Sequence, residues 1–191
     1  SLMFGTKERP GANENDEFLP VTAHGVKLLS MGLLINESDP VAVRGPLATR
    51  YVQQFLRNVA WGDVDFLILD LPPGTGDIQL TIVQTAGLDD ARKAIGLFER
   101  VETPILGVIE NMSYFQCPSD GKIYHIFGEG GGEREAAKLG VPLLGKIPLD
   151  IATRSGGDEG RPVALEDPEQ NPVSAAFRQV AEQCARVVLD R

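Results

Sequence analysis

Three short, almost wholly apolar runs, separated by stretches of helical periodicity, constrain the fold of this chain more than any other feature. The runs cover residues 64–70, 104–109 and 141–147. Runs this short and this apolar are typical of strands buried on both faces, which occur in parallel sheets covered by helices. Helical spacing of apolar residues falls at 46–59, 77–86, 88–101, 132–139 and 172–189. The alternation predicts an α/β fold with a mainly parallel sheet flanked by helices on both faces.

The organisation along the chain is interrupted at one junction. Two helical stretches meet at Ala86-Gly87 with no strand between them. A helix broken at glycine is one interpretation, and the absence of a loop, a strand and a second loop is the other. Upstream, short β-prone runs flank His24-Gly25, which is predicted to be a turn. Because no repeat or linker separates parts of the chain, residues 1–191 are predicted to form a single domain.

Bulk charge and cysteine usage restrict the class of partner. The formal net charge is −9 and the pI is near 4.7, which argues against a nucleic-acid partner, because nucleic acids select a basic face. No window approaches the ~20 apolar residues of a membrane span, so no membrane partner is expected. The two cysteines cannot form a disulfide framework, which favours a reducing compartment and a cytoplasmic location.

The sharpest local pattern follows the first apolar run, at residues 67–77. A buried strand would place Asp70 at its carboxyl end, where open α/β sheets bind ligands. A carboxylate there can hold Mg²⁺ through water, while Gly74 and Gly76 allow the backbone to approach a γ-phosphate. Asp77 follows where a helix begins, and it can cap that helix or orient an attacking water. The alternative is a strand, a Pro-Pro-Gly turn and an N-cap aspartate without a ligand.

A phosphate-binding loop should accompany such a pattern, and the sequence offers two weak candidates. Residues 140–146 match G-x-x-x-x-G-K formally, but the interior is Pro-Leu-Leu and Pro148 ends the segment where a helix should start. This stretch is therefore predicted to be a strand. Residues 128–132 are rich in glycine, but the acidic side chains around them disfavour phosphate, and a flexible turn is predicted instead.

The two cysteines have different surroundings. Cys117 precedes Pro118, Ser119 and Asp120 in a polar turn, where a thiolate can bind zinc or an iron–sulfur cluster, although an inert surface thiol is an equal alternative. Cys184 belongs to the apolar stripe of the helix at 172–189 and is predicted to lie in the core.

With these patterns in hand, the chain resembles the Mrp/ApbC-type branch of the MinD/ParA-like P-loop ATPases. The matching strings run nearly from end to end. They include residues 43–46, 61–65, 69–77, 90–93, 107–115, 126–132 and 145–150. No single string is decisive, but their combination is highly specific to this family.

The resemblance implies an ATP-hydrolysing homodimer that carries a 4Fe–4S cluster to apo iron–sulfur client proteins. Asp70 would belong to the Walker B strand, holding Mg²⁺ through water, and Asp77 would be its partner in catalysis. The nucleotide, ATP or ADP, would contact two groups of residues. These are the switch residues Gly74, Thr75 and Gly76, and the base-recognition residues Asn111, Pro148, Leu149 and Asp150. Cys117 would be the iron–sulfur ligand.

The chain departs from the family pattern in three places. Family members carry a Walker A loop and a switch I segment ahead of the point where Ser1 begins, so this chain alone is not expected to bind ATP tightly. They also have a strand near Ala86-Gly87, which favours missing residues there. The paired cysteines C-P-x-C appear as Cys117-Pro118-Ser119-Asp120, so Asp120 would be the second ligand. The rival function is a MinD/ParA-like, nucleotide-dependent partner switch without a cluster.

Overall fold

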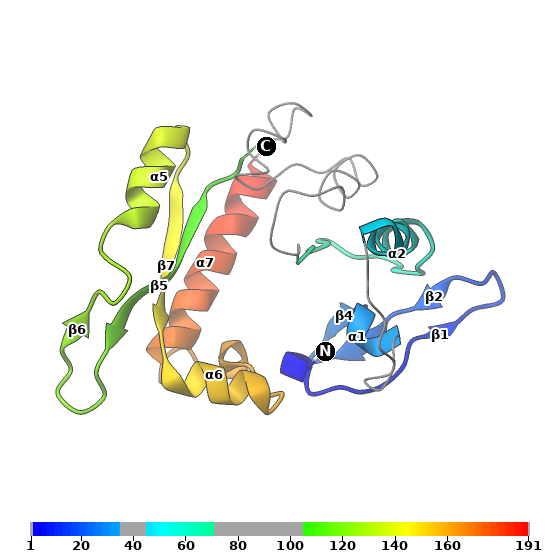
Figure 1. The fold of residues 1–191 in the computed structure, drawn as a ribbon, viewed down its shortest axis with the longest axis horizontal. Coiled ribbons are helices and arrows are strands. Elements are labelled where there is room, and N and C mark those ends of the chain that lie inside the picture. The colour runs from blue at the N-terminus through cyan, green and yellow to red at the C-terminus, as the bar shows by residue number, and fades with distance from the viewer. Residues whose placement is uncertain (1, 35–44, 71–104, 191) are drawn as a thin grey trace. The chain divides into compact units, whose positions relative to one another are not determined.

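The computed structural model describes residues 2–34, 45–70 and 105–190, which fall into two compact units. The first unit lies within residues 6–105 and the second comprises residues 2–5 and 106–191. Figure 1 labels most of their helices and strands. The predicted helices at 77–86 and 88–101 and the junction at Ala86-Gly87 lie outside the described residues. The single domain expected for residues 1–191 stays a prediction.

The described residues of the first unit form two small antiparallel ladders and two helices. Strand β1 (Gly11–Ala12) pairs with β2 (Phe18–Leu19), and β3 (Val21–Ala23) pairs with β4 (Val26–Leu28). The predicted turn at His24-Gly25 is confirmed. Both of its residues have positive φ, 50° and 77°, as a tight two-residue hairpin requires. Helix α1 (Met31–Leu34) follows, and α2 (Gly45–Arg57) confirms the helix predicted at 46–59.

The segment that follows α2 corrects the sequence prediction. Residues 64–70 form no strand, and most of their apolar side chains are exposed, with Ile68 89% exposed, while Leu69 is half-buried. The apolar pattern showed that this run can be buried, but a strand also needs neighbours that pair with its backbone N–H and C=O groups. No strand lies beside residues 64–70 in the part of the chain that the structure describes.

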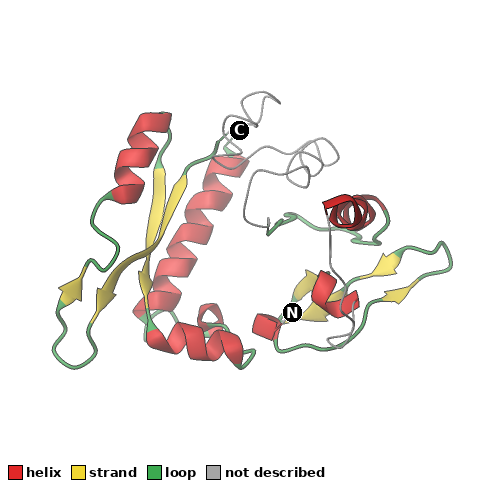
Figure 2. Ribbon diagram, viewed as in Figure 1, coloured by secondary structure: helices red, strands yellow, loops and turns green. Residues whose placement is uncertain are grey.

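The second unit is built on a three-stranded sheet in the order β6-β5-β7 (Figure 2). Strand β5 (Val108–Gln116) pairs in parallel with β7 (Leu143–Leu149), and its far end pairs with the antiparallel β6 (Ile123–Tyr124). A strand was predicted at 104–109 and another at 141–147, and both observed strands start later and extend further along the chain: β5 shares only Val108 and Ile109 with its predicted range, and β7 shares 143–147. Residues 143–147 are thus confirmed as strand rather than phosphate-binding loop.

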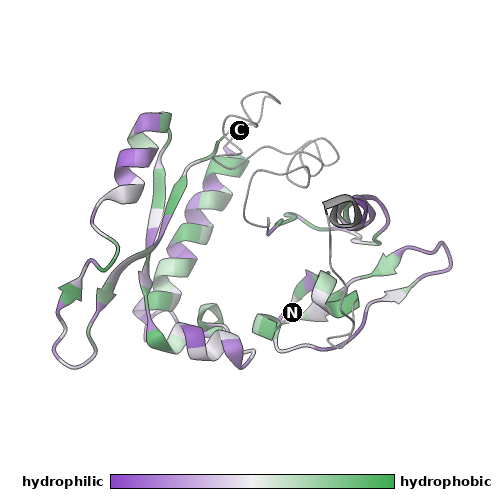
Figure 3. Ribbon diagram, viewed as in Figure 1, coloured by the Kyte–Doolittle hydropathy of each residue, from purple (hydrophilic) through white to green (hydrophobic). Residues whose placement is uncertain are grey.

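Helices cover both faces of this sheet, as the α/β fold predicted. A Cβ added at Gly145 of β7 would lie 2.6 Å from Val180 Cγ2 of α7 (Pro172–Leu189). The next residue, Lys146, forms an ion pair with Glu133 of α5 (Gly131–Leu139). Because successive residues of a strand point to opposite faces, α5 and α7 lie on opposite faces of the sheet. Figure 3 shows hydrophobic residues concentrated in the strands and along α7.

Among the remaining elements of the second unit, the sequence predicted one helix and missed another. Helix α7 matches the predicted range 172–189, because the Asn171 side chain accepts N–H bonds at its start and Pro172 occupies its first turn. Helix α6 (Ile151–Asp158) was not predicted. The short 3₁₀ turns η1 (Leu2–Phe4) and η3 (Val163–Leu165) complete the unit. Gly5 and Gly160 meet so closely that a Cβ at Gly160 would clash with the backbone of Gly5.

Candidate functional site

The parallel pair β5–β7 brings together the residues that the sequence assigned to base recognition. Asn111 of β5 lies opposite Ile147 of β7, and Pro148 and Leu149 follow directly along β7. The exposed Asn111 lies where the regular register of the parallel pair ends, beside the carboxyl end of β7, and carboxyl ends of strands are where α/β sheets bind ligands. Asp150 follows at the end of β7 and caps α6: its carboxylate accepts from Thr153 N at 2.6 Å and Thr153 Oγ1 at 2.8 Å.

Immediately after Asn111, strand β5 bulges. Asn111 pairs with Ile147 and Phe115 with Leu149, so more residues lie between the paired positions on β5 than on β7. Met112 adopts φ 53°, and its N–H donates to Asn111 Oδ1 at 2.9 Å. The side chain of Ser113 donates to the carbonyl of Ile147 at 3.2 Å. The bulge suits Pro148, which has no N–H to offer to a regular ladder.

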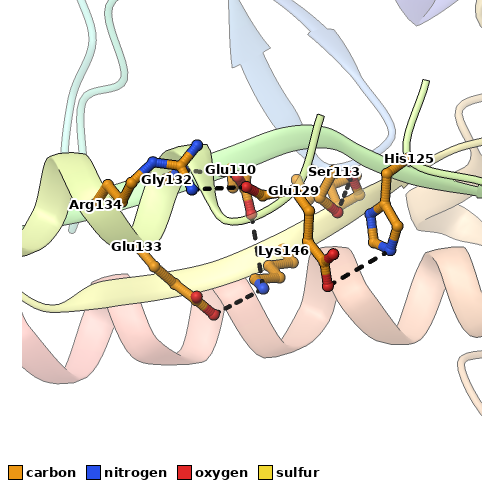
Figure 4. Close-up of polar contacts among 9 residues, drawn as sticks. Glu110, Ser113, His125, Glu129, Gly132, Glu133, Arg134 and Lys146 are labelled. Carbon is orange, nitrogen blue, oxygen red and sulfur yellow. Dashed lines mark hydrogen bonds and ion pairs between the residues drawn. The ribbon is translucent and has the colours of Figure 1, made fainter. Parts of the chain in front are cut away.

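A charged network lies directly before the bulge (Figure 4). Glu110 Oε1 accepts a hydrogen bond from Gly132 N, in the first turn of α5, at 2.6 Å. Its other oxygen lies 3.8 Å from Lys146 Nζ, and that ammonium lies 2.8 Å from Glu133 Oε1. The Glu133 carboxylate raises the pKa of Lys146, and the hydrogen bond from Lys146 lowers the pKa of Glu133. The network ties β5, β7 and α5 together.

The predicted cysteine ligand lies in the loop that joins β5 to β6. Cys117 N donates to Lys122 O at 2.9 Å and Gly121 N donates to Cys117 O at 2.8 Å, which closes the loop. Cys117 Sγ lies 3.0 Å from Ser119 Oγ. Asp120 accepts from Lys122 N at 3.1 Å and forms an ion pair with Lys122 Nζ at 3.2 Å. The partly exposed thiol and the carboxylate of Asp120 therefore share one short turn.

The turn also adjusts the protonation of both groups. A hydrogen bond from the Ser119 side chain, helped by the backbone N–H groups of Ser119 and Asp120, lowers the pKa of Cys117. The N–H of Lys122 is the largest cause of the lowered pKa of Asp120, followed by a hydrogen bond with the Cys117 side chain. Because thiolate is the form that binds metals, the turn favours the reactive state of Cys117.

The sequence-wide comparison decides the family. The family model described as NUBPL iron-transfer P-loop NTPase, of the ParA group, matches residues 1–185. The chain belongs to this family. The resemblance predicted from its motifs is thus confirmed, and so is the α/β fold class.

Known relatives agree with this assignment. The chain is 39% identical to an iron–sulfur cluster carrier protein of Pseudomonas fragi, over 97% of this chain and 70% of that protein. It is 38% identical to an Arabidopsis thaliana protein named iron–sulfur protein required for NADH dehydrogenase, mitochondrial, over 97% of this chain and 63% of that protein. The chain therefore spans only part of the length of the relatives it matches.

A solved structure is also similar to this NTPase family member. It is a nucleotide-binding protein from Archaeoglobus fulgidus in complex with ADP, with a TM-score of 0.69 and 32% identity. The similarity covers 84% of this chain and 68% of that one.

The predicted site residues of this P-loop NTPase divide into three groups. The structure brings Asn111, Pro148 and Leu149 together, with Asp150 directly after them, and it places Cys117 and Asp120 in one turn. Asp70 is exposed at the end of the segment without a strand, so its expected Walker B strand is not formed there. Asp77 and the switch residues Gly74, Thr75 and Gly76 lie outside the described residues.

The predicted iron–sulfur ligands of one chain are only two side chains, those of Cys117 and Asp120. Across residues 2–34, 45–70 and 105–190, no group of three or more histidine, cysteine, aspartate or glutamate side chains could hold a metal ion.

The predicted core position of Cys184 is partly right, because this thiol on α7 is half-buried. No helix among the described residues is long and apolar enough to cross a membrane.

The network of Glu110, Gly132 and Lys146 was missed at the sequence level. Of the glycine-rich stretch predicted as a flexible turn, residues 128–130 precede α5 without helical structure, whereas Gly131 and Gly132 form its first turn, with Gly130 as a left-handed N-cap. A Cβ at Gly132 would lie 2.7 Å from Glu110 Cβ, so glycine is required for this approach. The only local signal was an acidic residue in an apolar run, Glu110, which needs a partner when it is buried.

Proposed function

We propose that this P-loop NTPase family member is an ATP-dependent carrier that holds an iron–sulfur cluster through Cys117 and passes it to apo-proteins. The observation that carries the proposal is the β5–β6 turn, where the partly exposed Cys117 thiol, hydrogen-bonded to Ser119, has a lowered pKa, within a chain of an iron-transfer family. The names of the relatives from Pseudomonas fragi and Arabidopsis thaliana support it.

The ligand chemistry calls for a second copy of the chain. One thiolate and one carboxylate from a single turn supply half of the four ligands of a cluster, so we propose a homodimer in which two turns meet. Carboxylate is a harder ligand than thiolate and holds iron–sulfur clusters less firmly. Asp120 would also have to release its ion pair with Lys122. A weakly held 4Fe–4S cargo suits a protein whose task is to give it away.

We infer that the nucleotide binds at the carboxyl end of β5 and β7. The amide of Asn111 would recognise the adenine edge, beside Pro148 and Leu149, and Asp150 would help to shape the base pocket through α6. Asp70 would hold Mg²⁺ through water, with Asp77 and the residues Gly74, Thr75 and Gly76 near the γ-phosphate. ATP hydrolysis and a cytoplasmic location belong to the same proposal. The ADP bound to the Archaeoglobus fulgidus protein supports nucleotide binding.

The test is anaerobic reconstitution of the full-length protein with ferrous iron and sulfide. We expect a broad thiolate-to-iron absorption band and about one 4Fe–4S cluster per dimer. Cys117→Ser should abolish the band, whereas the matched control Cys184→Ser should retain it, because Cys184 lies on α7 and outside the turn. Transfer is then measured as activation of an apo iron–sulfur protein.

A second function, a nucleotide-dependent partner switch without a cluster, is favoured by the carboxylate of Asp120 where the family has a second cysteine. The reconstitution experiment separates the two functions. If the wild type gains no band and Cys117→Ser leaves ATP hydrolysis and dimer formation unchanged, the carrier proposal is wrong and the switch is supported.

A further inference from the structure

The side chain of Glu110 is held by two partners, one on α5 and one on β7, directly before the point where β5 leaves its regular register with β7. Its carboxylate accepts from Gly132 N at 2.6 Å, and Lys146 Nζ lies 3.8 Å away. The side chain is only 14% exposed. A carboxylate at the first turn of a helix is stabilised by the free N–H groups and by the helix dipole, and α5 provides both.

Helix α5 packs closely against the side chain of Glu110. A Cβ on Gly132 would lie 2.7 Å from Glu110 Cβ and 3.1 Å from its Cγ. The helix can approach β5 this closely only because residue 132 is glycine. Lys146 balances the charge, and Glu133 fixes Lys146 in turn, with 2.8 Å between Lys146 Nζ and Glu133 Oε1.

This anchor lies next to Asn111, which is the last residue of β5 in register with β7 before the bulge. Glu110 pairs with Lys146 and Asn111 with Ile147, and the ladder resumes only at Phe115. Beyond Asn111 the backbone turns through Met112 at φ 53°. On its Glu110 side the backbone of Asn111 is held by the regular ladder, whereas beyond it the contacts are the hydrogen bonds from Met112 N to Asn111 Oδ1 and from Ser113 Oγ to Ile147 O.

We propose that Glu110 is a positioning residue for base recognition: by joining β5 to the first turn of α5, it holds the Asn111 amide at the angle that adenine requires. This inference rests on the proposed nucleotide site. It assigns to the glycine-rich start of α5 a structural role in nucleotide selectivity, because the N-terminal anion site of this helix is filled by the chain's own carboxylate rather than by phosphate.

The experiment compares ADP and GDP affinities of the full-length protein by isothermal titration calorimetry. Glu110→Ala should lower the preference for ADP by about five- to tenfold, which corresponds to the loss of one well-aligned hydrogen bond. Glu110→Gln should retain most of the preference, since its amide oxygen can still accept from Gly132 N. In an Asn111→Ala background, Glu110→Ala should produce no further loss of preference.

Two additional variants keep the test decisive. Gly132→Ala disturbs the same contact from α5 and favours helix formation, so it should lower the preference even if Glu110→Ala does not fold. Glu182→Ala removes a carboxylate of the same charge from the exposed ion pair with Arg178 on α7, and it should leave the preference unchanged. Thermal unfolding shows which variants are folded.

The outcomes separate this inference from the proposed function. If the wild type prefers ADP and both Glu110→Ala and Gly132→Ala keep that preference, or weaken ADP and GDP by the same factor, Glu110 is merely structural and the inference is overturned. If the wild type binds ADP and GDP equally well, adenine recognition itself fails, and this inference fails with it.

Discussion

Residues 64–70 and strand β7 are similarly apolar segments of one chain, but they lie in opposite environments. In β7, Ile147 is only 7% exposed, with β5 along one edge, α7 on one face and α5 on the other. In residues 64–70, Ile68 is 89% exposed. The difference teaches that an apolar run supplies only the capacity for burial, whereas strand formation depends on the segments that reach its edges and faces.

The strongest test of this contrast is a pair of matched truncations. Ile147→Ala should cost ~2–5 kcal/mol of unfolding free energy, because it leaves a cavity between the sheet and α7. Ile68→Ala should change that free energy by no more than ~0.5 kcal/mol. Urea unfolding followed by circular dichroism measures both, since the fluorescence of Trp61 would report on the first unit, which holds Ile68, and not on the second unit, which holds Ile147. Equal costs at the two positions would contradict the contrast.

A second test concerns the close packing that β7 has and residues 64–70 lack. Gly145→Ala should destabilise the second unit by ~1–3 kcal/mol, because the new methyl group meets Val180 Cγ2 at 2.6 Å. Combined with Val180→Ala, the cost should be smaller than the sum of the two single changes. Strict additivity in urea unfolding would mean that α7 does not pack on Gly145.

A third test addresses the helix that covers β7. Asn171→Ala should cost ~1 kcal/mol, because the side chain accepts from Val173 N at 2.8 Å and Ser174 N at 3.2 Å at the start of α7. Asn171→Asp should retain most of the stability, since its carboxylate can accept the same bonds. A loss of equal size in both variants would show that the cap is not the source of the effect.

The smallest expected effect concerns the turn that follows β5, which contains Cys117 and Ser119. The Ser119 hydroxyl lowers the pKa of Cys117, so Ser119→Ala should raise it and slow alkylation near neutral pH. The rate of iodoacetamide modification rises with pH as thiolate forms. Its midpoint should therefore lie at higher pH in Ser119→Ala than in the parent, both measured in a Cys184→Ser background. An unchanged midpoint would contradict the role of Ser119.

The sequence predicted the second unit better than the first, because residues adjacent in sequence mark the ends of the helices in the second unit. Asn171 and Pro172 mark the start of α7, and glycines flank α5 at both ends. Helix α6 escaped prediction because Gly156 and Gly157 interrupt its pattern. The extension of β5 to Gln116 depends on pairing with β6, which no apolar run announces.

The candidate site was predicted to the extent that it consists of short motifs. The turn from Cys117 to Asp120 and the residues proposed for base recognition, Asn111 and Pro148, could be named from their strings. The contact of Glu110 with Gly132 joins residues 22 apart in sequence, and the one with Lys146 crosses from one strand to another. Such contacts depend on the register of β5 against β7, which periodicity does not specify.

The continuity of β5 has a consequence for which insertions and deletions this family member can accept. One strand carries Asn111 and ends one residue before Cys117. Adding or removing one residue in a regular strand turns every later side chain to the opposite face. A one-residue length change between Phe115 and Cys117, beyond the bulge, would therefore turn the thiol to the opposite face relative to Asn111. The bulge at Met112 and Ser113 is the place where an extra residue could be absorbed, so length variants should be tolerated there and not on either side of it.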